Sequence, residues 1–241
     1  MSARYRSNYI DHKRKQYRTI RLIGIALLVL LGYIAVTTLI FSTRNLETNS
    51  MEPQLRTGDR FIVSSFTIRS LFSDLGLMKR NPSLHRGDIV LVHHGITKQP
   101  NIFLIFADGI VRFFTAQRIS ILSTDEDFFI KRVVALPGDE ISIAGFICRV
   151  KPRDALYPVT EFELTTKPYT VNIPQIPALW DQSLPFSGIY SSTVVGEDEY
   201  FVLSDDRSNT NDARTWGPIP VESLSGRLLF RYWPLNRFGI P

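Results

Sequence analysis

The chain is organised around residues 47–55, which read ETNSMEPQL and follow a long apolar segment by only a few positions. Ser50 lies in the middle of this stretch, six residues beyond Arg44, the first charged residue after the apolar segment. A serine hydroxyl is a weak nucleophile until a base removes its proton. Ser50 is therefore a candidate nucleophile only if the rest of the chain supplies such a base.

The apolar segment, residues 22–43, contains no charged residue and no proline. A helix of this length would extend about 33 Å, enough to cross a hydrocarbon core of about 30 Å. A cleavable signal peptide is the alternative, but the apolar run is longer than the usual run of about 7–15 residues, and no clear small-x-small cleavage site follows it. We therefore expect a retained transmembrane helix over residues 22–43.

The positive charge of the chain is concentrated in its first 21 residues, which carry seven Lys and Arg residues against one Asp. This tail has a net charge of +6, so the formal total of +5 leaves −1 for the remainder. A basic charge confined to one tail does not indicate nucleic-acid binding. By the positive-inside rule, we expect residues 1–21 to form a cytoplasmic tail that faces anionic lipid, and residues 44–241 to be an extracytoplasmic domain.

Residues 44–241 consist of short apolar runs separated by Gly, Pro and Asp, a pattern typical of β-structure. Gly-Asp pairs at 58–59 and 87–88 each precede an apolar run, and we expect each pair to form a turn that leads into a strand. The tripeptide Arg-Gly-Asp at residues 86–88 is explained by such a turn, so it does not indicate an adhesion motif.

Two segments interrupt this β-pattern and are predicted to be insertions. The first, at about 93–127, is expected to contain an amphipathic helix within residues 100–122, either buried on the domain or in contact with the lipid interface. The second, at about 145–195, contains six prolines and is expected to be an irregular insertion rather than a separate domain.

Residues 128–136, FFIKRVVAL, predict a buried strand that ends at Pro137. Strand alternation places Phe129, Lys131 and Val133 on one face. A lysine on an apolar face either extends its amine to water or is desolvated, which lowers its pKa. In the second case the amine is neutral near physiological pH and can act as a base, as an arginine could not. Lys131 is therefore the candidate base for Ser50.

The other reactive side chains fit less well. Cys148 is the only cysteine, so no intrachain disulfide forms, and its apolar neighbours indicate a strand residue. The adjacent His93 and His94 could serve a Ser-His-Asp triad or a zinc site, but no metal-ligand spacing or third ligand is visible. We expect no metal and no cofactor.

A polar loop, SDDRSNTNDAR at residues 204–214, follows the predicted strand 200–203 and precedes a last strand at 227–233. In order and spacing, the chain resembles the four sequence boxes of bacterial type I signal peptidases at residues 48–55, 86–92, 131–139 and 204–217. These enzymes are membrane-bound Ser/Lys proteases that remove signal peptides from exported proteins. Together with the apolar segment, the resemblance covers nearly the whole chain.

The resemblance implies a mainly β fold: an N-terminal transmembrane helix followed by a β-rich catalytic domain with an inserted helix. It also implies that Ser50 is the acylating nucleophile and Lys131 its general base. The Ser50 backbone N–H and the Thr48 hydroxyl would form the oxyanion hole.

Three supporting residues are implied in the polar loop. Thr210 would orient the Lys131 amine through a hydrogen bond, and Asp212 would pair with Arg214 to hold the loop.

The implied function is a serine endopeptidase of the cytoplasmic (inner) membrane, single-pass, that cleaves exported preproteins after small residues. Its partners would be signal-peptide-bearing preproteins and membrane lipid, with no nucleic acid. A self-cleaving Ser/Lys protease of the repressor type would need a DNA-binding domain where this chain has an apolar segment. A non-catalytic anchored β-domain that binds signal peptides or envelope partners remains the alternative.

The chain departs from the family pattern at six positions, which leaves the rate and the loop geometry open. Threonine stands for the usual serine at two of them, and both keep a hydroxyl on a stiffer, β-branched side chain. The departures are Thr48, Gln54, Ala135, Ser204, Asp206 and Thr210. Ser204 and Ala135 stand where the family usually has glycine.

Overall fold

The computed structural model describes residues 2–36, 41–66, 73, 76, 82–93, 102–114, 128–175 and 188–241. The chain divides into two units, one formed by residues 1–38 and 100–123 and the other by residues 39–99 and 124–241. Predictions on His94 and on residues 115–127 lie outside the described residues.

The first unit contains helix α1, Ser2–Ala35, and helix α3, Ile102–Phe114. Within α1, Lys15–Ala35 is long and apolar enough to cross a membrane. The predicted helix 22–43 is too long at its C-terminal end, because α1 ends at Ala35 and Phe41 already begins strand β1. The absence of charge and proline cannot by itself mark where the helix ends, because β1 begins with the uncharged residues Phe41, Ser42 and Thr43.

Helix α3 confirms the inserted helix. It contacts α1, and the side chains of Phe103, Leu104 and Ile110 are exposed. Contact of this apolar surface with lipid stays a prediction.

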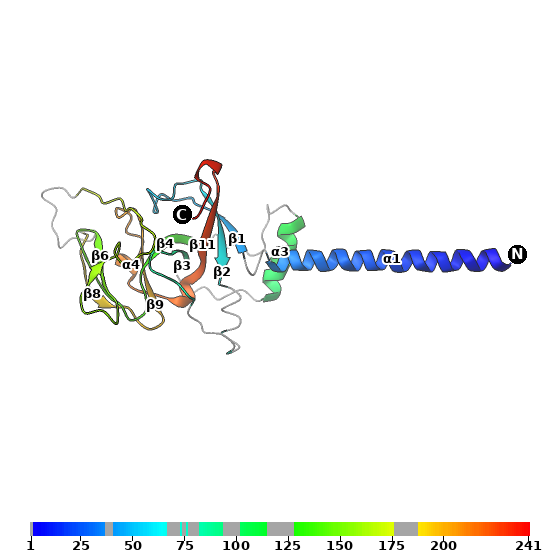
Figure 1. The fold of residues 1–241 in the computed structure, drawn as a ribbon, viewed down its shortest axis with the longest axis horizontal. Coiled ribbons are helices and arrows are strands. Elements are labelled where there is room, and N and C mark those ends of the chain that lie inside the picture. Colours follow the sequence, from blue (N-terminus) through cyan, green and yellow to red (C-terminus); the bar gives the residue numbers. More distant parts are fainter. Residues whose placement is uncertain are drawn as a thin grey trace. The chain divides into compact units, whose positions relative to one another are not determined.

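The second unit is built from two antiparallel sheets, which confirms the mainly β fold (Figure 1). The larger sheet has the strand order β1-β2-β11-β3-β4-β9-β10. Its strands are β1 (Phe41–Asn45), β2 (Arg60–Ser65), β11 (Leu224–Trp233), β3 (Ile89–His93), β4 (Phe128–Ala135), β9 (Glu199–Leu203) and β10 (Ile219–Pro220). Short helical turns flank its last strands: α4 (Ala213–Trp216), η2 (Val221–Ser223) and η3 (Leu235–Arg237).

The smaller sheet corrects one prediction. It has the order β7-β6-β5-β8 and consists of β7 (Val159–Thr160), β6 (Ile147–Lys151), β5 (Glu140–Ala144) and β8 (Tyr190–Val194). Three of these strands lie in residues 145–195, so that segment is not irregular. Pro152 and Pro158 fall just outside β6 and β7, so these prolines bound the strands and do not exclude them.

Buried side chains pack against both faces of the larger sheet. In β3, Val90 and Val92 belong to one apolar cluster, whereas Ile89 and Leu91 belong to another. A strand covered on both faces is continuously apolar, which explains the run IVLV. The first cluster also includes side chains of the smaller sheet, so the two sheets share a core.

The predicted Gly-Asp turns are confirmed. Gly58 and Gly87 have φ of 90° and 94°, a region that favours glycine because it has no Cβ. Each is followed by an aspartate whose side chain accepts a backbone N–H from three residues earlier, and Pro137-Gly138-Asp139 repeats the arrangement. These hydrogen bonds join Arg56 to Asp59 (3.0 Å), His85 to Asp88 (2.9 Å) and Leu136 to Asp139 (2.8 Å).

Candidate active site

Ser50 lies in a tight turn that follows β1. The Glu52 N–H donates to the Asn49 carbonyl at 3.0 Å, and the Leu55 N–H donates to the Met51 carbonyl at 2.9 Å. Apolar side chains on either side of Ser50 anchor this turn in the second core cluster: Leu46, Met51 and Leu55. Ser50 is only 3% exposed.

The Thr48 hydroxyl, predicted to form the oxyanion hole with the Ser50 N–H, neighbours the Ser50 hydroxyl. Thr48 Oγ1 lies 3.1 Å from Ser50 Oγ, within hydrogen-bonding distance. Thr48 is exposed, whereas Ser50 is buried. Among the described residues, the Ser50 backbone N–H donates to no acceptor.

Lys131 is fully enclosed on β4, with 1% of its surface exposed. Its Nζ lies 5.8 Å from the centre of the Phe129 ring and 6.0 Å from that of the Trp216 ring. The predicted shared face of Phe129 and Lys131 is thus present. Nζ donates a hydrogen bond of 2.8 Å to the Ser204 hydroxyl.

Burial lowers the pKa of Lys131 from its ordinary value of 10.5 to about 8. The Asp212 carboxylate opposes this effect, Arg214 reinforces it, and Asp205 opposes it. Desolvation dominates because an ammonium group loses its hydration in an apolar site. A substantial fraction of the amine is therefore neutral at mildly alkaline pH.

One loop contacts both Ser50 and Lys131. The Asp206 N–H donates to the Ser50 carbonyl at 3.0 Å, and Ser204 accepts from Lys131. Because Ser204 and Asp206 are only two residues apart, Ser50 and Lys131 lie on the same side of the domain.

The predicted ion pair between Asp212 and Arg214 is present in this loop, at 2.8 Å. Asp212 caps α4 by accepting the Arg214 N–H and also accepts the Ser204 N–H, each at 3.0 Å. Burial alone would raise the pKa of Asp212, but Arg214 and these N–H groups hold the pKa of that carboxyl below its ordinary range. Arg214 also donates to the carbonyls of Arg207 and Asn209.

Thr210 is placed differently from the expectation. It is half-buried, and its carbonyl accepts the Thr215 hydroxyl at 2.6 Å. Within the part of the chain that the structure describes, the Lys131 amine donates to Ser204 and not to Thr210. An orienting role for Thr210 stays a prediction.

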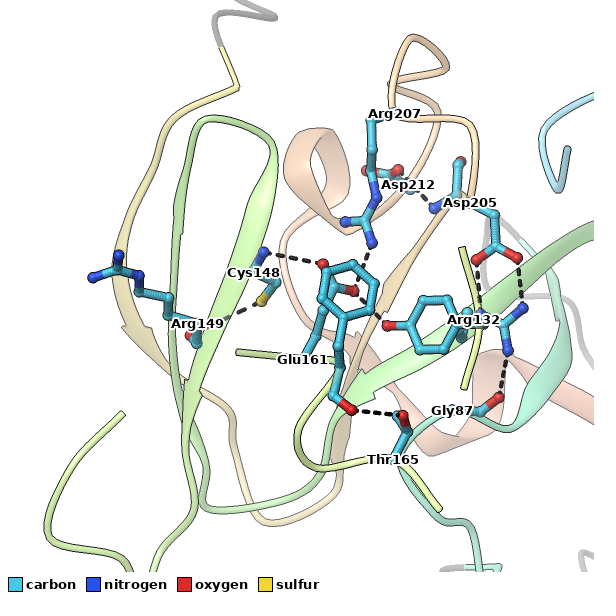
Figure 2. A network of polar contacts seen from close by, with 12 residues as sticks. Gly87, Arg132, Cys148, Arg149, Glu161, Thr165, Asp205, Arg207 and Asp212 are labelled. Atoms are coloured by element: carbon cyan, nitrogen blue, oxygen red, sulfur yellow. Dashed lines mark hydrogen bonds and ion pairs between the residues drawn. The ribbon is translucent and has the colours of Figure 1, made fainter. Parts of the chain in front are cut away.

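Arg132 connects the four sequence boxes that resemble those of signal peptidases: it lies in the third and contacts a residue of each of the others. Its guanidinium pairs with Asp205 at 2.5 Å and donates to the Gly87 carbonyl at 2.7 Å (Figure 2). It also donates to Gln54 Oε1 at 2.8 Å. The Tyr169 ring stacks on it, with the ring centre 4.1 Å from Cζ. Gln54, which replaces a usual threonine, is thereby held by an arginine that fixes the loop.

The segment 145–195 contributes a buried network that the sequence did not predict. Glu161 pairs with Arg207 at 2.5 Å and accepts the Tyr169 hydroxyl at 2.6 Å (Figure 2). Asn172 donates its N–H to the Asp205 carbonyl at 2.9 Å and accepts the Arg207 N–H at 2.8 Å. This segment therefore holds the 204–214 loop. The burial of Glu161 could not be predicted, because it lies in a segment whose sequence indicated irregular structure.

Two of the residues set aside in the sequence, Cys148 and His93, lie in the described part of the chain. Cys148 is buried on β6, and burial raises the pKa of its thiol. The His93 ring packs against Phe128 with 3.9 Å between ring centres. Among the described residues, no group of three or more His, Cys, Asp and Glu side chains is placed to hold a metal ion.

The chain matches known signal peptidases over most of its length. Residues 16–233 match the family described as signal peptidase, peptidase S26. A probable signal peptidase I-2 of Synechocystis sp. is 27% identical over 207 residues, which cover 86% of this chain and 70% of that protein. The signal peptidase I of Leptolyngbya laminosa is 27% identical over 222 residues, covering 91% of this chain and 81% of that protein. The signal peptidase IB of Staphylococcus aureus is 25% identical over 181 residues, covering 74% and 82%.

A mainly β domain with an apolar N-terminal helix, together with these matches, defines a membrane-associated serine endopeptidase. The chain belongs to the signal peptidase family, peptidase S26, and within it to the type I enzymes.

Proposed function

We propose that this protein removes signal peptides from exported preproteins through a Ser/Lys dyad, with Ser50 as the nucleophile and Lys131 as the general base. The observation that carries the proposal is the loop 204–206. It holds the Ser50 carbonyl through Asp206 and the Lys131 amine through Ser204, so the backbone of the proposed nucleophile and the amine of the proposed base both contact one short segment.

In the acylation step, Ser50 Oγ attacks the scissile carbonyl carbon while its proton passes to the neutral Lys131 amine. The tetrahedral intermediate then breaks its C–N bond, and the Lys131 ammonium gives the proton to the leaving amine. The products are an ester on Ser50 and the mature protein with a free N-terminus. In the second step, Lys131 removes a proton from water, which attacks the ester carbonyl carbon. The Lys131 ammonium then returns that proton to Ser50 Oγ as the ester C–O bond breaks, and the signal peptide leaves with a new C-terminal carboxyl group, which ionises to a carboxylate.

The Thr48 hydroxyl and the Ser50 N–H are proposed to stabilise the oxyanion. The 3.1 Å contact between the Thr48 and Ser50 hydroxyl oxygens supports this assignment, because a donor this close to Ser50 Oγ would be near the carbonyl that Ser50 attacks. Removing one such donor in other proteases costs about 10²–10³ in kcat. Asp212 and Arg214 are proposed to hold the loop that carries these contacts.

The proposal includes a preference for small residues before the cleaved bond. It also includes the orientation of the chain in the membrane. The basic tail would lie in the cytoplasm and residues 44–241 on the outer side of the cytoplasmic membrane. Protease protection in sealed inside-out vesicles tests this orientation: the catalytic domain should resist added protease until detergent is present. Digestion of the catalytic domain without detergent would place that domain on the cytoplasmic side and contradict the proposed topology.

The proposal is tested with the full chain in detergent and a purified precursor protein. We expect cleavage after a small residue, abolished by Ser50→Ala and by Lys131→Arg. Ser191→Ala on β8 and Lys151→Arg on β6 are matched controls on exposed or half-exposed side chains and should keep wild-type activity. Binding of the precursor without cleavage by the wild type would instead favour the non-catalytic alternative.

A further inference from the structure

The amine of Lys131 has one acceptor among the described residues, the Ser204 hydroxyl at 2.8 Å. Both side chains are buried. We propose that Ser204 is a positioning residue that orients the Lys131 amine toward Ser50. The inference rests on the proposed function, because it requires Lys131 to act as the base.

The contact is built into the larger sheet. Strands β4 and β9 pair in antiparallel fashion, with Arg132 opposite Leu203. Continued by one residue, this register places Ser204 opposite Lys131, and opposite residues of an antiparallel pair project from the same face. The position of the hydroxyl therefore depends on strand pairing and not on the conformation of a long loop.

Ser204 is fixed on both sides. Its own N–H donates to Asp212 at 3.0 Å. The next residue, Asp205, is paired with Arg132, and the one after it, Asp206, donates its N–H to the Ser50 carbonyl. The backbone that carries the Ser204 hydroxyl is thus hydrogen-bonded to the turn that contains Ser50. Through this backbone, the position of the Lys131 amine is fixed relative to that turn.

The direction of the hydrogen bond suits the chemistry. A neutral amine has two N–H donors and one lone pair. When the Ser204 oxygen accepts one N–H, the lone pair stays available for the Ser50 proton. A partner that donated to the amine would occupy that lone pair, so an acceptor hydroxyl is the partner that the base requires.

The family pattern usually has glycine at position 204, which offers no hydroxyl, and assigns the orienting role to the side chain at position 210. In this chain, Thr210 uses its carbonyl to bind Thr215. Ser204, one of the departures from the pattern, thus supplies the hydroxyl that contacts the amine.

The test measures kcat and KM for precursor cleavage by the full chain in detergent, as a function of pH. We expect Ser204→Ala to lower kcat by about 10–100-fold, the size of loss that misplacing a catalytic group causes, with little change in KM. Ser204→Gly, a residue that the family pattern accepts here, should show the same loss if folding of the alanine variant is in question. Ser204→Thr keeps a hydroxyl and should restore most of the rate, and Ser191→Ala is the control.

A second measurement does not depend on activity. The Lys131 ammonium is influenced by Asp212, Arg214 and Asp205 and donates to Ser204, so loss of that acceptor removes a contact that favours the charged form. NMR titration of the Lys131 ε-carbon should therefore give a lower pKa in Ser204→Ala than in the wild type, and the acid limb of the kcat profile should move to lower pH.

Unchanged kcat and an unchanged Lys131 titration in Ser204→Ala would overturn the inference even if the wild type cleaves precursors. So would a full loss of rate in Thr210→Val with wild-type rate in Ser204→Ala, because the orienting hydroxyl would then be at 210. A wild-type chain that does not cleave would contradict the proposed function instead, and the titration would still report whether Ser204 binds the amine.

Discussion

The backbone N–H of Asp206 donates a hydrogen bond of 3.0 Å to the carbonyl oxygen of Ser50. It joins two segments that are far apart in sequence: the turn after β1 and the loop after β9. Since Ser204 in the same loop accepts from Lys131, this bond connects the proposed nucleophile to its proposed base through the backbone.

Activity should rise with pH through the pKa of Lys131, because only the neutral amine can accept the Ser50 proton. Burial lowers that pKa to about 8 in the free enzyme, so half of the maximal kcat/KM is expected near that pH. The measurement is kcat/KM for precursor cleavage over mildly acidic to alkaline pH, because this ratio reports the free enzyme. A flat profile would exclude Lys131 as the base.

Lys131→Met should stabilise the protein at neutral pH. The pKa of Lys131 is about 8 in the folded state and is expected near its ordinary 10.5 in the unfolded state, so the unfolded state holds more protons between these values. The folded state is therefore penalised by about 3 kcal/mol below pH 8, and this penalty disappears as pH rises to 10.5.

Some of this gain is offset by the loss of the hydrogen bond to Ser204, so we expect a net increase of about 1–2 kcal/mol in the free energy of unfolding. Denaturant unfolding of the wild type and of Lys131→Met, in detergent at pH 7 and at pH 10.5, measures this difference in the free energy of unfolding. An equal change at both pH values would mean that protonation of Lys131 is not the cause.

Thr48→Val should lower kcat by about 10²–10³ with little effect on KM, because its hydroxyl donor acts on charge that develops in the transition state. Thr48→Ser keeps the donor and is the matched control. Equal losses in binding and turnover for the valine variant would place Thr48 in substrate binding and not in the oxyanion hole.

Glu161→Ala should destabilise the fold by about 3–5 kcal/mol, because it leaves the buried Arg207 guanidinium without its counter-charge. The matched control is Glu197→Ala, which breaks an exposed ion pair with Arg153 and should leave the melting temperature nearly unchanged. Similar melting temperatures for both variants would show that the buried network does not stabilise the 204–214 loop.

Most of the fold could be predicted where local chemistry decides the structure. The Gly-Asp turns at 58–59 and 87–88 follow from glycine conformation and aspartate capping, and both lead into the expected strands. The apolar face around Lys131 follows from strand alternation. The end of α1 at Ala35 was missed, because no charged residue or proline occurs between that position and Arg44, and β1 begins within this stretch at Phe41.

The rest depends on pairings that sequence spacing does not reveal. Ser204 contacts Lys131 because of the register between β4 and β9, which no local pattern encodes. The burial of Glu161 likewise requires that the smaller sheet fold over the polar loop, a contact between segments 46 residues apart.

The most direct test of the central claim is to trap the acyl-enzyme. The full chain in detergent is mixed with a precursor peptide, quenched in acid within one turnover and digested, and fragments containing residues 47–55 are examined by mass spectrometry. We predict that the signal-peptide portion of the substrate is attached to Ser50 and that Ser50→Ala forms no adduct. An adduct on another residue, or cleavage that persists in Ser50→Ala, would contradict the account.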